Sequence, residues 1–229
     1  LAHQMKVDLA ELPTAQLITE SWLRQYLENR ASSTALQPPL SPMDPSAMIV
    51  YGGGGHGKSL IDLVRSLGAY RIMGVVDDGL KPGDKVMGLP VLGGGEALPQ
   101  LYAQGVHLAI NAVGGIGNLS VRLKVFQKLK QAGFGFPFVV HPSAVVAASA
   151  SLAPGVQVFA HAYVGSEARL GFGAIVNTGA IVSHDCVLED YVNLSPGAIL
   201  AGDVHIGSGV LLGMGATVNL GVRIGSGAR

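Results

Sequence analysis

The chain has 229 residues, of which 48% are hydrophobic and 13% are charged, and its formal net charge at pH 7 is +0. Balanced charge argues against a protein that holds nucleic acid electrostatically, because such proteins cluster Lys and Arg. No apolar run approaches the roughly 20 residues that span a bilayer, and no signal peptide opens the chain. We therefore expect a cytoplasmic protein without a transmembrane segment. The single cysteine, Cys186, excludes an intrachain disulfide.

The first 46 residues are expected to form a leader that precedes the folded domains. Residues 14–29 place Leu, Ile, Trp and Tyr side chains along one stripe, which predicts a helix. Residues 31–46 are rich in Ser and Pro, a composition that favours an extended linker.

From residue 47 the pattern changes to alternating strands and helices, which is typical of a parallel α/β sheet. The expected strands are Ala47–Tyr51, Arg71–Val76, Val106–Val113 and Phe134–Val140, and the expected helices are Lys58–Leu67 and Asn118–Ala132. These elements predict a small Rossmann-like βαβαβ domain over residues 47–140.

A glycine turn joins the first of these strands to the first helix. Gly52, Gly54 and Gly57 match GxGxxG, which leaves backbone N–H groups and a helix N-terminus free for a phosphate. Asp77 and Asp78 end the next strand, where carboxylates suit ribose or base recognition. The pattern predicts a domain that binds a ligand carrying a nucleotide. The alternatives are a purely structural turn and NAD binding, but a dehydrogenase also needs a domain for hydride transfer, which the following repeats do not suit.

Residues 146–229 fill fourteen unbroken hexapeptides, each with Val, Leu or Ile first and Ala, Val or Cys fifth. An amphipathic helix does not repeat in this way. A period of six combines three alternations of a strand, so large and small apolar side chains enter one interior in turn. The repeats predict a parallel β-helix, which we assign to residues 141–229. The first positions are Val146, Leu152, Val158, Val164, Leu170, Val176, Val182, Leu188, Leu194, Leu200, Ile206, Leu212, Val218 and Ile224.

The glycine turn from Tyr51 to Lys58, the two aspartates and the hexapeptides together resemble sugar O- and N-acyltransferases of the sialic acid O-acetyltransferase and bacillosamine N-acetyltransferase type. The resemblance covers residues 47–229 and implies a left-handed β-helix with roughly 18 residues per coil. It also implies an acetyl-CoA-dependent acetyltransferase that acts on an amino or hydroxyl group of a nucleotide-sugar, with a UDP-linked amino sugar as the expected substrate. For single residues it implies Gly54, Gly55 and His56 beside the sugar phosphates, Asp77 and Asp78 at the nucleoside, and Gly114 in the sugar pocket.

The stretch from Asn177 to Cys186 resembles the part of this family that carries the catalytic histidine. His184 occupies a third hexapeptide position, so its side chain should project outward from a coil. Acetyl transfer needs a base to take a proton from the attacking amine or hydroxyl, and imidazole exchanges protons readily near neutral pH. Asp185 would favour the charged imidazole. The alternative is that His184 is a solvated surface histidine.

The stacking of coils adds an argument for the acyl-donor site. Gly202 is 18 residues after His184, so it should lie directly above it, leaving space and a backbone N–H that could stabilise an oxyanion. The resemblance implies contacts of acetyl-CoA at Asn193, Gly202 and Met214. Asn193 departs from the family pattern, since relatives often have His at that position.

Two other functions remain as alternatives. A zinc-dependent carbonic anhydrase can be built on the same repeat, and His161, His184 and His205 invite the comparison. Folded into coils, however, these three histidines fall in different columns, so we expect no metal site. A non-catalytic nucleotide-sugar-binding or scaffold protein is the second alternative.

The sixth hexapeptide positions, which should point outward, form three columns with different character. One column contains Tyr163, Ile181, Ile199 and Thr217. An apolar outward row of this kind predicts a subunit interface. The family forms trimers, so we expect a homotrimer in which His184 of one subunit completes a pocket on the next. The other two columns are mixed and compatible with water or ligand.

The C-terminal end of the repeats is abrupt. Arg229 closes the fourteenth hexapeptide without a capping segment, which solenoids normally have. We therefore expect the β-helix to be truncated at its C-terminus.

Overall fold

The computed structural model describes residues 44–114 and 119–229. The helix predicted over residues 14–29 and most of the expected linker lie outside these described residues. None of the described helices is long and apolar enough to cross a membrane.

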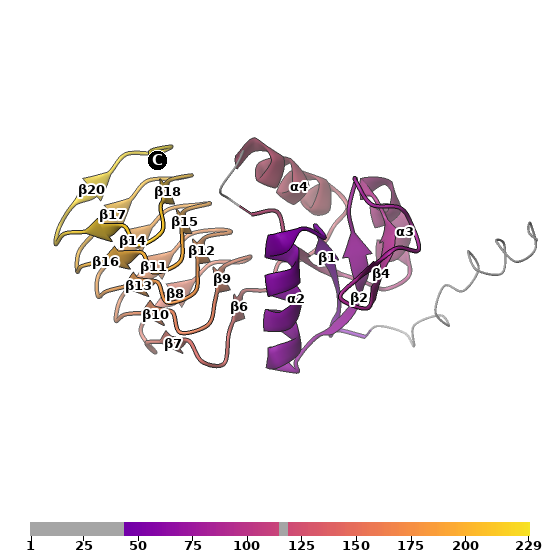
Figure 1. Ribbon diagram of the computed structural model, residues 1–229, viewed down its shortest axis with the longest axis horizontal. Helices are drawn as coiled ribbons and strands as arrows, with labels where there is room; N and C mark the ends of the chain where they lie inside the picture. The colour runs from indigo at the N-terminus through magenta and orange to yellow at the C-terminus, as the bar shows by residue number, and fades with distance from the viewer. Residues whose placement is uncertain (1–43, 115–118) are drawn as a thin grey trace, which may run out of the picture. The chain divides into compact units, whose positions relative to one another are not determined.

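The first part of the described chain is an α/β unit built on one five-stranded sheet in the order β3-β4-β2-β1-β5 (Figure 1). The strand β1 pairs in parallel with both β2 and β5, and β2 pairs in parallel with β4. Only β3 runs antiparallel to its neighbour β4. The strands are β1 (Ala47–Tyr51), β2 (Arg71–Val76), β3 (Lys85–Val86), β4 (Leu89–Gly93) and β5 (Leu108–Asn111).

Two long helices cover this sheet, α2 (Gly55–Leu67) and α4 (Leu119–Gln131). The apolar stripe of α2 is buried, and the helix ends at Gly68, whose left-handed φ of 63° lets its N–H bond to the carbonyl of Arg65. The sequence missed β3, β4, the short helix α3 (Leu98–Ala103) and the 3-10 turn η2 (Gly95–Ala97). These elements are short and rich in Gly and Pro, so they carry no clear periodicity.

The second part is a prism of fifteen two-residue strands, β6 to β20, arranged in three five-stranded parallel sheets. Each coil advances the chain by 18 residues, as the pairing of Tyr163 with Ile181 and of Ile181 with Ile199 shows. We name the sheets by their members: face A is β6-β9-β12-β15-β18, face B is β7-β10-β13-β16-β19, and face C is β8-β11-β14-β17-β20. The bounds are β6 (Val139–Val140), β7 (Val145–Val146), β8 (Ser151–Leu152), β9 (Gln157–Val158), β10 (Tyr163–Val164), β11 (Arg169–Leu170), β12 (Ile175–Val176), β13 (Ile181–Val182), β14 (Val187–Leu188), β15 (Asn193–Leu194), β16 (Ile199–Leu200), β17 (His205–Ile206), β18 (Leu211–Leu212), β19 (Thr217–Val218) and β20 (Arg223–Ile224).

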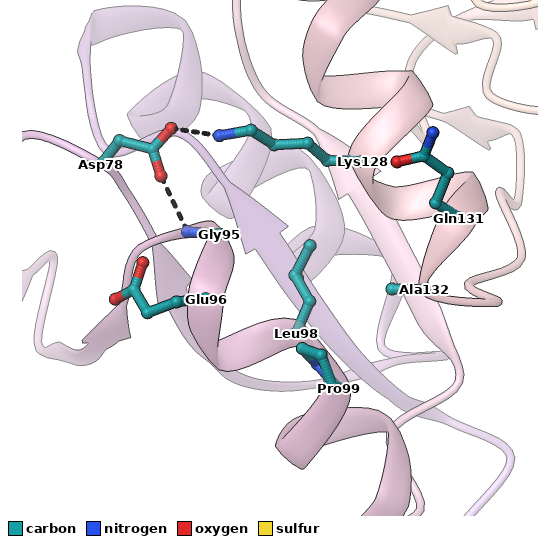
Figure 2. A pocket seen from close by; sticks show the side chains of 8 residues that line it. All are labelled: Asp78, Gly95, Glu96, Leu98, Pro99, Lys128, Gln131 and Ala132. Atoms are coloured by element: carbon teal, nitrogen blue, oxygen red, sulfur yellow. Dashed lines mark hydrogen bonds and ion pairs between the residues drawn. The ribbon is translucent and has the colours of Figure 1, made fainter.

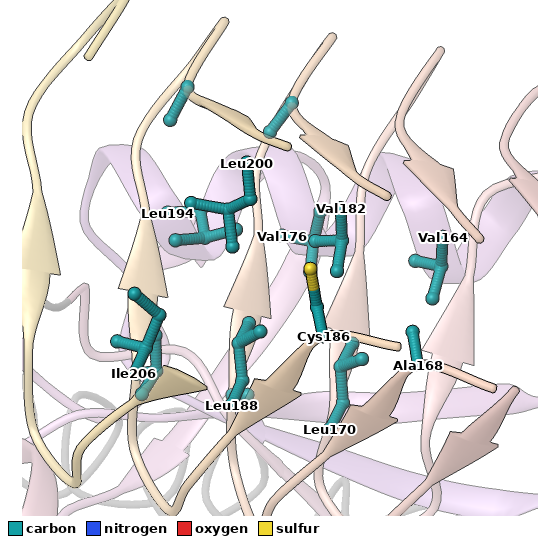
Figure 3. Close-up of a cluster of buried hydrophobic side chains, with 14 of the residues drawn as sticks. Val164, Ala168, Leu170, Val176, Val182, Cys186, Leu188, Leu194, Leu200 and Ile206 are labelled. Carbon is teal, nitrogen blue, oxygen red and sulfur yellow. The ribbon is translucent and has the colours of Figure 1, made fainter. Parts of the chain in front are cut away.

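The interior of the prism is filled by the first and fifth hexapeptide positions, as the repeat predicts. Figure 3 shows Val164, Val182 and Leu200 stacked from coil to coil, with Ala168 and Cys186 among the small side chains that fill the space between the aliphatic ones. Cys186 is completely buried, and its Sγ lies 3.1 Å from the carbonyl oxygen of Ala201. It is therefore a small core residue.

The corners of the prism turn at the fourth hexapeptide position. From Gly155 to Gly227 every such residue has a positive φ, including the non-glycine residues His161 (58°) and Asp185 (60°). Glycine adopts this conformation at little cost, and Asp tolerates it better than most side chains do. Asp185 therefore sits at a regular corner turn of the coil as well as beside His184.

Face A of the prism packs against the α/β unit. Ile175 on this face is fully buried in the same apolar cluster as Leu60 and Ile61 of α2. Gln157 and Asn193, in the same column, are 0% and 4% exposed. We expected this column to be compatible with water or ligand, and the structure instead covers Gln157 and Ile175 with a second layer of the protein.

The end of the α/β unit also differs from the strand predicted over Phe134–Val140. Gly135 makes only an isolated parallel bridge to Leu108, and β6 (Val139–Val140) pairs with β9 of the prism. The apolar run is therefore divided between the two parts of the fold, which a single stretch of hydrophobic residues cannot reveal.

Candidate active site

A cavity of about 400 Å³ lies between the glycine turn, which forms one wall, and residues of face A of the prism, which contribute to a second wall. Gly52 has a φ of 117°, and a Cβ there would lie 3.0 Å from the carbonyl carbon of Ala112, so the turn requires glycine. The residues that line the cavity are Gly52, Gly54, Gly55, His56, Asp77, Ala112, Val113, Gly114, Asn177 and Asn193.

The N-terminus of α2 opens toward this cavity. Gly54 is the N-cap and makes no side-chain capping bond, and the first backbone bond of the helix runs from the N–H of Lys58 to the carbonyl of Gly54. The N–H groups of the first turn have no partner within the helix and carry its positive dipole end. Such an end is suited to hold a phosphate.

The two aspartates after β2 point to different places. Asp77 lines the cavity, and its carboxylate accepts hydrogen bonds from the N–H groups of Gly53 (2.7 Å) and Gly79 (2.8 Å). It therefore fixes the glycine turn from the side of β2.

Asp78 lies in a second, open pocket of about 380 Å³ between η2, α3 and α4 (Figure 2). Its carboxylate pairs with Lys128 (2.8 Å) and accepts bonds from the N–H of Gly95 (2.7 Å) and the hydroxyl of Tyr51 (2.9 Å). The Lys128 bond, the largest cause, holds the pKa of Asp78 below its usual range. The carboxylate thus anchors the turn at Gly95 to α4.

A buried chain of amide hydrogen bonds joins the glycine turn to the prism. Nε2 of His56 lies 2.9 Å from Oε1 of Gln157, whose Nε2 donates to the carbonyl of Asn111 (2.8 Å). Asn111 in turn donates to the carbonyl of Arg122 (2.8 Å) and accepts from the N–H of Val113 (3.0 Å). The network crosses from α2 through face A to the end of β5 and the start of α4.

Burial, together with the charge of Arg122, lowers the pKa of His56 to about 4. Arg122 is itself fully buried and bonds to the carbonyl of Gly173, while its Nε and Nη1 have no partner among the residues that the structure describes. Burial accordingly lowers the pKa of the guanidinium to about 10. At neutral pH His56 is therefore an uncharged imidazole beside a buried cation.

This environment predicts that stability falls in mild acid. The unfolded chain binds a proton at His56 near pH 6.5, but the folded protein binds it only near pH 4. The contribution of neutral His56 to the free energy of unfolding is therefore complete above pH 6.5 and is lost as the pH falls from 6.5 to 4. A shift of this size corresponds to about 3 kcal/mol. Urea unfolding at pH 7 and pH 5 should show about 2 kcal/mol of this loss, because pH 5 lies within the window, and the variant His56→Gln should reduce the difference. His141→Gln, at a half-buried histidine that takes no part in this network, is the control. An unchanged difference in His56→Gln would contradict the prediction.

His184 and Asp185 lie at the corner between faces B and C. Nδ1 of His184 is 2.7 Å from Oδ2 of Asp185, and both side chains are exposed, at 61% and 58%. This contact leaves Nε2 as the free nitrogen of the ring. Gly202 lies directly above, because a Cβ at Gly202 would overlap the ring of His184. The stacking expected from the repeat is observed at this position.

The residues predicted for one site thus fall in separate places. The cavity gathers Gly54, Gly55, His56, Asp77, Gly114 and Asn193. Asn193 follows His184 by nine residues, half of an 18-residue coil, so the two lie on different sides of the prism. His184 sits at the edge opposite face A. Met214 is 79% exposed and lies on the edge between faces A and B, in the column of Thr178.

Sequence reasoning missed Gln157, Asn111 and Arg122. The only signal was an amide at Gln157 in an outward column, which gives no indication of what covers it. The surroundings of Asn193 could not be predicted either. Its Oδ1 is buried without a hydrogen-bond partner in the described part of the chain. Among the described residues, no three His, Cys, Asp or Glu side chains are grouped to hold a metal ion.

A Rossmann-like unit whose glycine turn opens onto a hexapeptide β-helix defines a class of acyltransferases with two substrates. Residues 47–129 match the family model of the PglD N-terminal domain. A structure of a mutant GDP-perosamine N-acetyltransferase from Caulobacter crescentus, in complex with CoA and GDP-perosamine, is 37% identical with a TM-score of 0.74, and the match covers 81% of this chain and 86% of that one.

Two further solved structures are similar. The acetyltransferase domain of PglB from Neisseria gonorrhoeae, in complex with acetyl coenzyme A, is 36% identical with a TM-score of 0.72, and the match covers 80% of this chain and 86% of that domain. WeeI from Acinetobacter baumannii is 25% identical with a TM-score of 0.59, covering 79% of this chain and 89% of that one.

The chain belongs to the hexapeptide-repeat sugar acyltransferases of the sialic acid O-acetyltransferase and bacillosamine N-acetyltransferase type. The expected fold, a Rossmann-like domain followed by a left-handed parallel β-helix, is confirmed. The protein is a sugar acetyltransferase that uses acetyl-CoA as its acyl donor.

Proposed function

We propose that this protein transfers an acetyl group from acetyl-CoA to the amino group of a nucleotide-linked amino sugar. The observation that carries the proposal is the cavity in which the glycine turn, Asp77 and Gly114 face two amides of the prism, Asn177 and Asn193. Such a site combines a phosphate-binding helix end with polar groups suited to a sugar. The Caulobacter relative is named as an N-acetyltransferase in complex with CoA and GDP-perosamine, which supports an amine as acceptor.

We assign the diphosphate to the backbone N–H groups at the start of α2, around Gly54, Gly55 and His56. The nucleoside then lies toward β2 and the aspartates, and the sugar lies toward Gly114 and the prism. The family resemblance favours UDP as the nucleotide, whereas the ligand named for the Caulobacter relative carries GDP. Both nucleotides therefore enter the assay below.

The chemistry needs a base that the cavity of one chain does not provide. Among its described lining residues, His56 is a weak base because its pKa is lowered to about 4, and Asp77 is bonded to two backbone N–H groups. We propose that Nε2 of His184, with Nδ1 held by Asp185, accepts the proton of the attacking amine. The amine nitrogen bonds to the thioester carbonyl carbon, the carbon–sulfur bond breaks, and the proton passes to the CoA thiolate.

His184 lies across the prism from the cavity of its own chain, so we propose that it serves the cavity of a neighbouring copy. Face B provides the surface for this assembly. Tyr163 (41%) and Ile199 (40%) are exposed on it, Ile181 between them is half-buried, and Val145 (59%) extends the row. An apolar row on a regular face suits a closed homotrimer, in which each edge reaches the next subunit.

Acetyl-CoA then lies between neighbouring prisms, with the thioester beside His184 and Gly202. We assign the amide of Asn193 and the exposed Met214 to contacts with the same acetyl-CoA molecule. The backbone N–H of Gly202 is the candidate donor for the developing oxyanion.

The direct test measures CoA release with acetyl-CoA and either GDP-linked or UDP-linked 4-amino sugars, followed by mass analysis of the sugar. We expect release that depends on the amino sugar, with a gain of one acetyl group on nitrogen. The matching 4-hydroxy sugars serve as controls and should not be acetylated. Acetylation of the hydroxy sugars alone, or release of CoA without an acetylated sugar, would refute the proposal.

The two aspartates should contribute differently to ligand binding. Asp77→Asn removes an acceptor from the glycine turn in the cavity, and we expect the affinity for the nucleotide-sugar to fall by about tenfold, the loss expected for one charge-assisted hydrogen bond. Asp78→Asn should change the affinity by less than about threefold, because its exposed pair with Lys128 anchors a neighbouring turn. Calorimetry with the preferred nucleotide-sugar decides. Equal losses in both variants would contradict this division.

Gly202→Ala should reduce activity without unfolding the protein. An added methyl group would occupy the space of the His184 ring, so the imidazole must rotate away from its present position. We expect kcat to fall by about 100-fold, the lower range for a displaced general base, with the melting temperature nearly unchanged. Gly225→Ala is the matched control, because a Cβ at Gly225 meets no atom within 4 Å. Normal turnover by Gly202→Ala would show that the position of the ring is unimportant.

A further inference from the structure

The hydrogen bonds around Gln157 determine which nitrogen of His56 carries a proton. The carbonyl of Asn111 can only accept, so the Gln157 atom 2.8 Å from it must be the amide nitrogen. The amide oxygen of Gln157 therefore faces His56, and Nε2 of His56, 2.9 Å away, must be the donor. Gln157 is fully buried and Asn111 is 1% exposed, so water does not compete for these bonds.

The remaining nitrogen, Nδ1, has no hydrogen-bond partner among the residues that the structure describes. The ring packs near Phe159, with 5.4 Å between centroids. His56 lines the cavity together with Gly114, where an added Cβ would lie 3.4 Å from the Cβ of His56. Because burial and Arg122 keep the ring uncharged at neutral pH, Nδ1 bears a lone pair and no proton.

We propose that Gln157 is a positioning residue of the active site, which holds His56 as the tautomer protonated on Nε2 and so makes Nδ1 a hydrogen-bond acceptor for the ligand. The group that suits Nδ1 is a hydroxyl or amine of the sugar. Phosphate oxygens need donors, so they bind the backbone N–H groups of the α2 N-terminus and not this imidazole. The inference rests on the proposed function for the identity of the ligand, the nucleotide-linked amino sugar.

The same bonds couple the ligand site to the β-helix. His56 and Gln157 are 101 positions apart in the chain, and Gln157 belongs to β9 on face A. A ligand that engages His56 is therefore held in register with the prism, on which Asn193 and the acyl donor lie.

The spectroscopic test uses the full-length protein with 15N-labelled histidine. The ring signals of His56 are assigned by their loss in His56→Gln. We expect Nε2 to be protonated and Nδ1 to be bare at pH 7. Addition of the GDP-linked or UDP-linked amino sugar should then shift Nδ1 and leave Nε2 protonated. A proton on Nδ1 in the free protein, or an unchanged Nδ1 signal with saturating ligand, would overturn the proposal.

The variant Gln157→Met, which keeps the volume but removes both hydrogen bonds, tests the role of the amide. We expect a mixture of His56 tautomers and a KM for the nucleotide-sugar raised about tenfold, as for one lost buried hydrogen bond. The KM for acetyl-CoA should stay within about twofold, because the donor does not contact this ring. A wild-type tautomer together with a wild-type KM would overturn the positioning role.

Ile175→Ala is the matched control. Ile175 lies one coil above Gln157 in the same buried column but makes no bond to His56. This variant should lower stability while it keeps the tautomer and the KM, so it separates a weakened interface from a lost hydrogen bond. If no amino sugar is acetylated, the proposed function fails, but the spectrum of the free protein still decides whether Gln157 sets the tautomer.

Discussion

Replacing His184 by alanine is expected to lower kcat by about 100-fold to 10,000-fold, the range typical of a missing general base. Binding of the nucleotide-sugar should change by less than about twofold, because the variant leaves intact every described residue that lines the cavity. The loss arises only in the transition state, when the amine gives up its proton. Steady-state CoA release and calorimetry with the nucleotide-sugar measure the two effects separately.

His205→Ala is the matched control for this experiment. His205 is another histidine of the prism paired with a carboxylate, since its Nε2 lies 3.0 Å from Oε1 of Glu189. It lies on face C in the column of Val187 and not in the corner column of His184 and Gly202, and its loss should leave turnover nearly normal. Full turnover by His184→Ala would exclude it as the base and direct attention to a base outside the pair His184–Asp185.

The double variant Ile181→Lys and Ile199→Lys is expected to produce monomers with at most a few per cent of the activity. Two ammonium groups in the centre of the apolar row on face B would have to be buried without partners in the assembled protein, which costs several kcal/mol per charge. Each isolated subunit should keep its fold, because both side chains point outward and the core positions of the prism are unchanged. Light scattering gives the assembly state, and CoA release gives the activity.

A mixing experiment distinguishes a shared site from a loss of stability. His184→Ala supplies an intact cavity without the base, and Asn193→Ala supplies the base without an intact cavity. If the site is shared between copies, subunits mixed at equal amounts and allowed to exchange should regain roughly a quarter of the wild-type activity, because one site in four then combines two intact parts in a closed ring. No recovery, or an active monomer of the unmodified protein, would contradict the shared site.

The hexapeptide period alone predicted much of the β-helix. It identified the buried first and fifth positions, the stacking of Gly202 on His184 and the outward direction of Ile181 and Ile199. These features follow from local geometry, because alternation along a strand and a fixed coil length decide which side chains meet. The glycine turn was predicted equally well, since a strand, a GxGxxG segment and an amphipathic helix are consecutive in the chain.

Only the tertiary structure decided which face of the prism is covered. The period places Gln157, Ile175 and Asn193 in one outward column, but it contains nothing about the surface that approaches them. His56 and Gln157 are hydrogen-bonded although they are 101 positions apart in the chain. Asp77 and Asp78 are adjacent in the chain, but Asp77 lines the cavity and Asp78 pairs with Lys128 of α4. Such contacts depend on how the α/β unit and the prism pack against each other. The sequence therefore determined the repeat, the glycine turn and the candidate base, whereas long-range packing determined the cavity, the tautomer of His56 and the separation of His184 from that cavity.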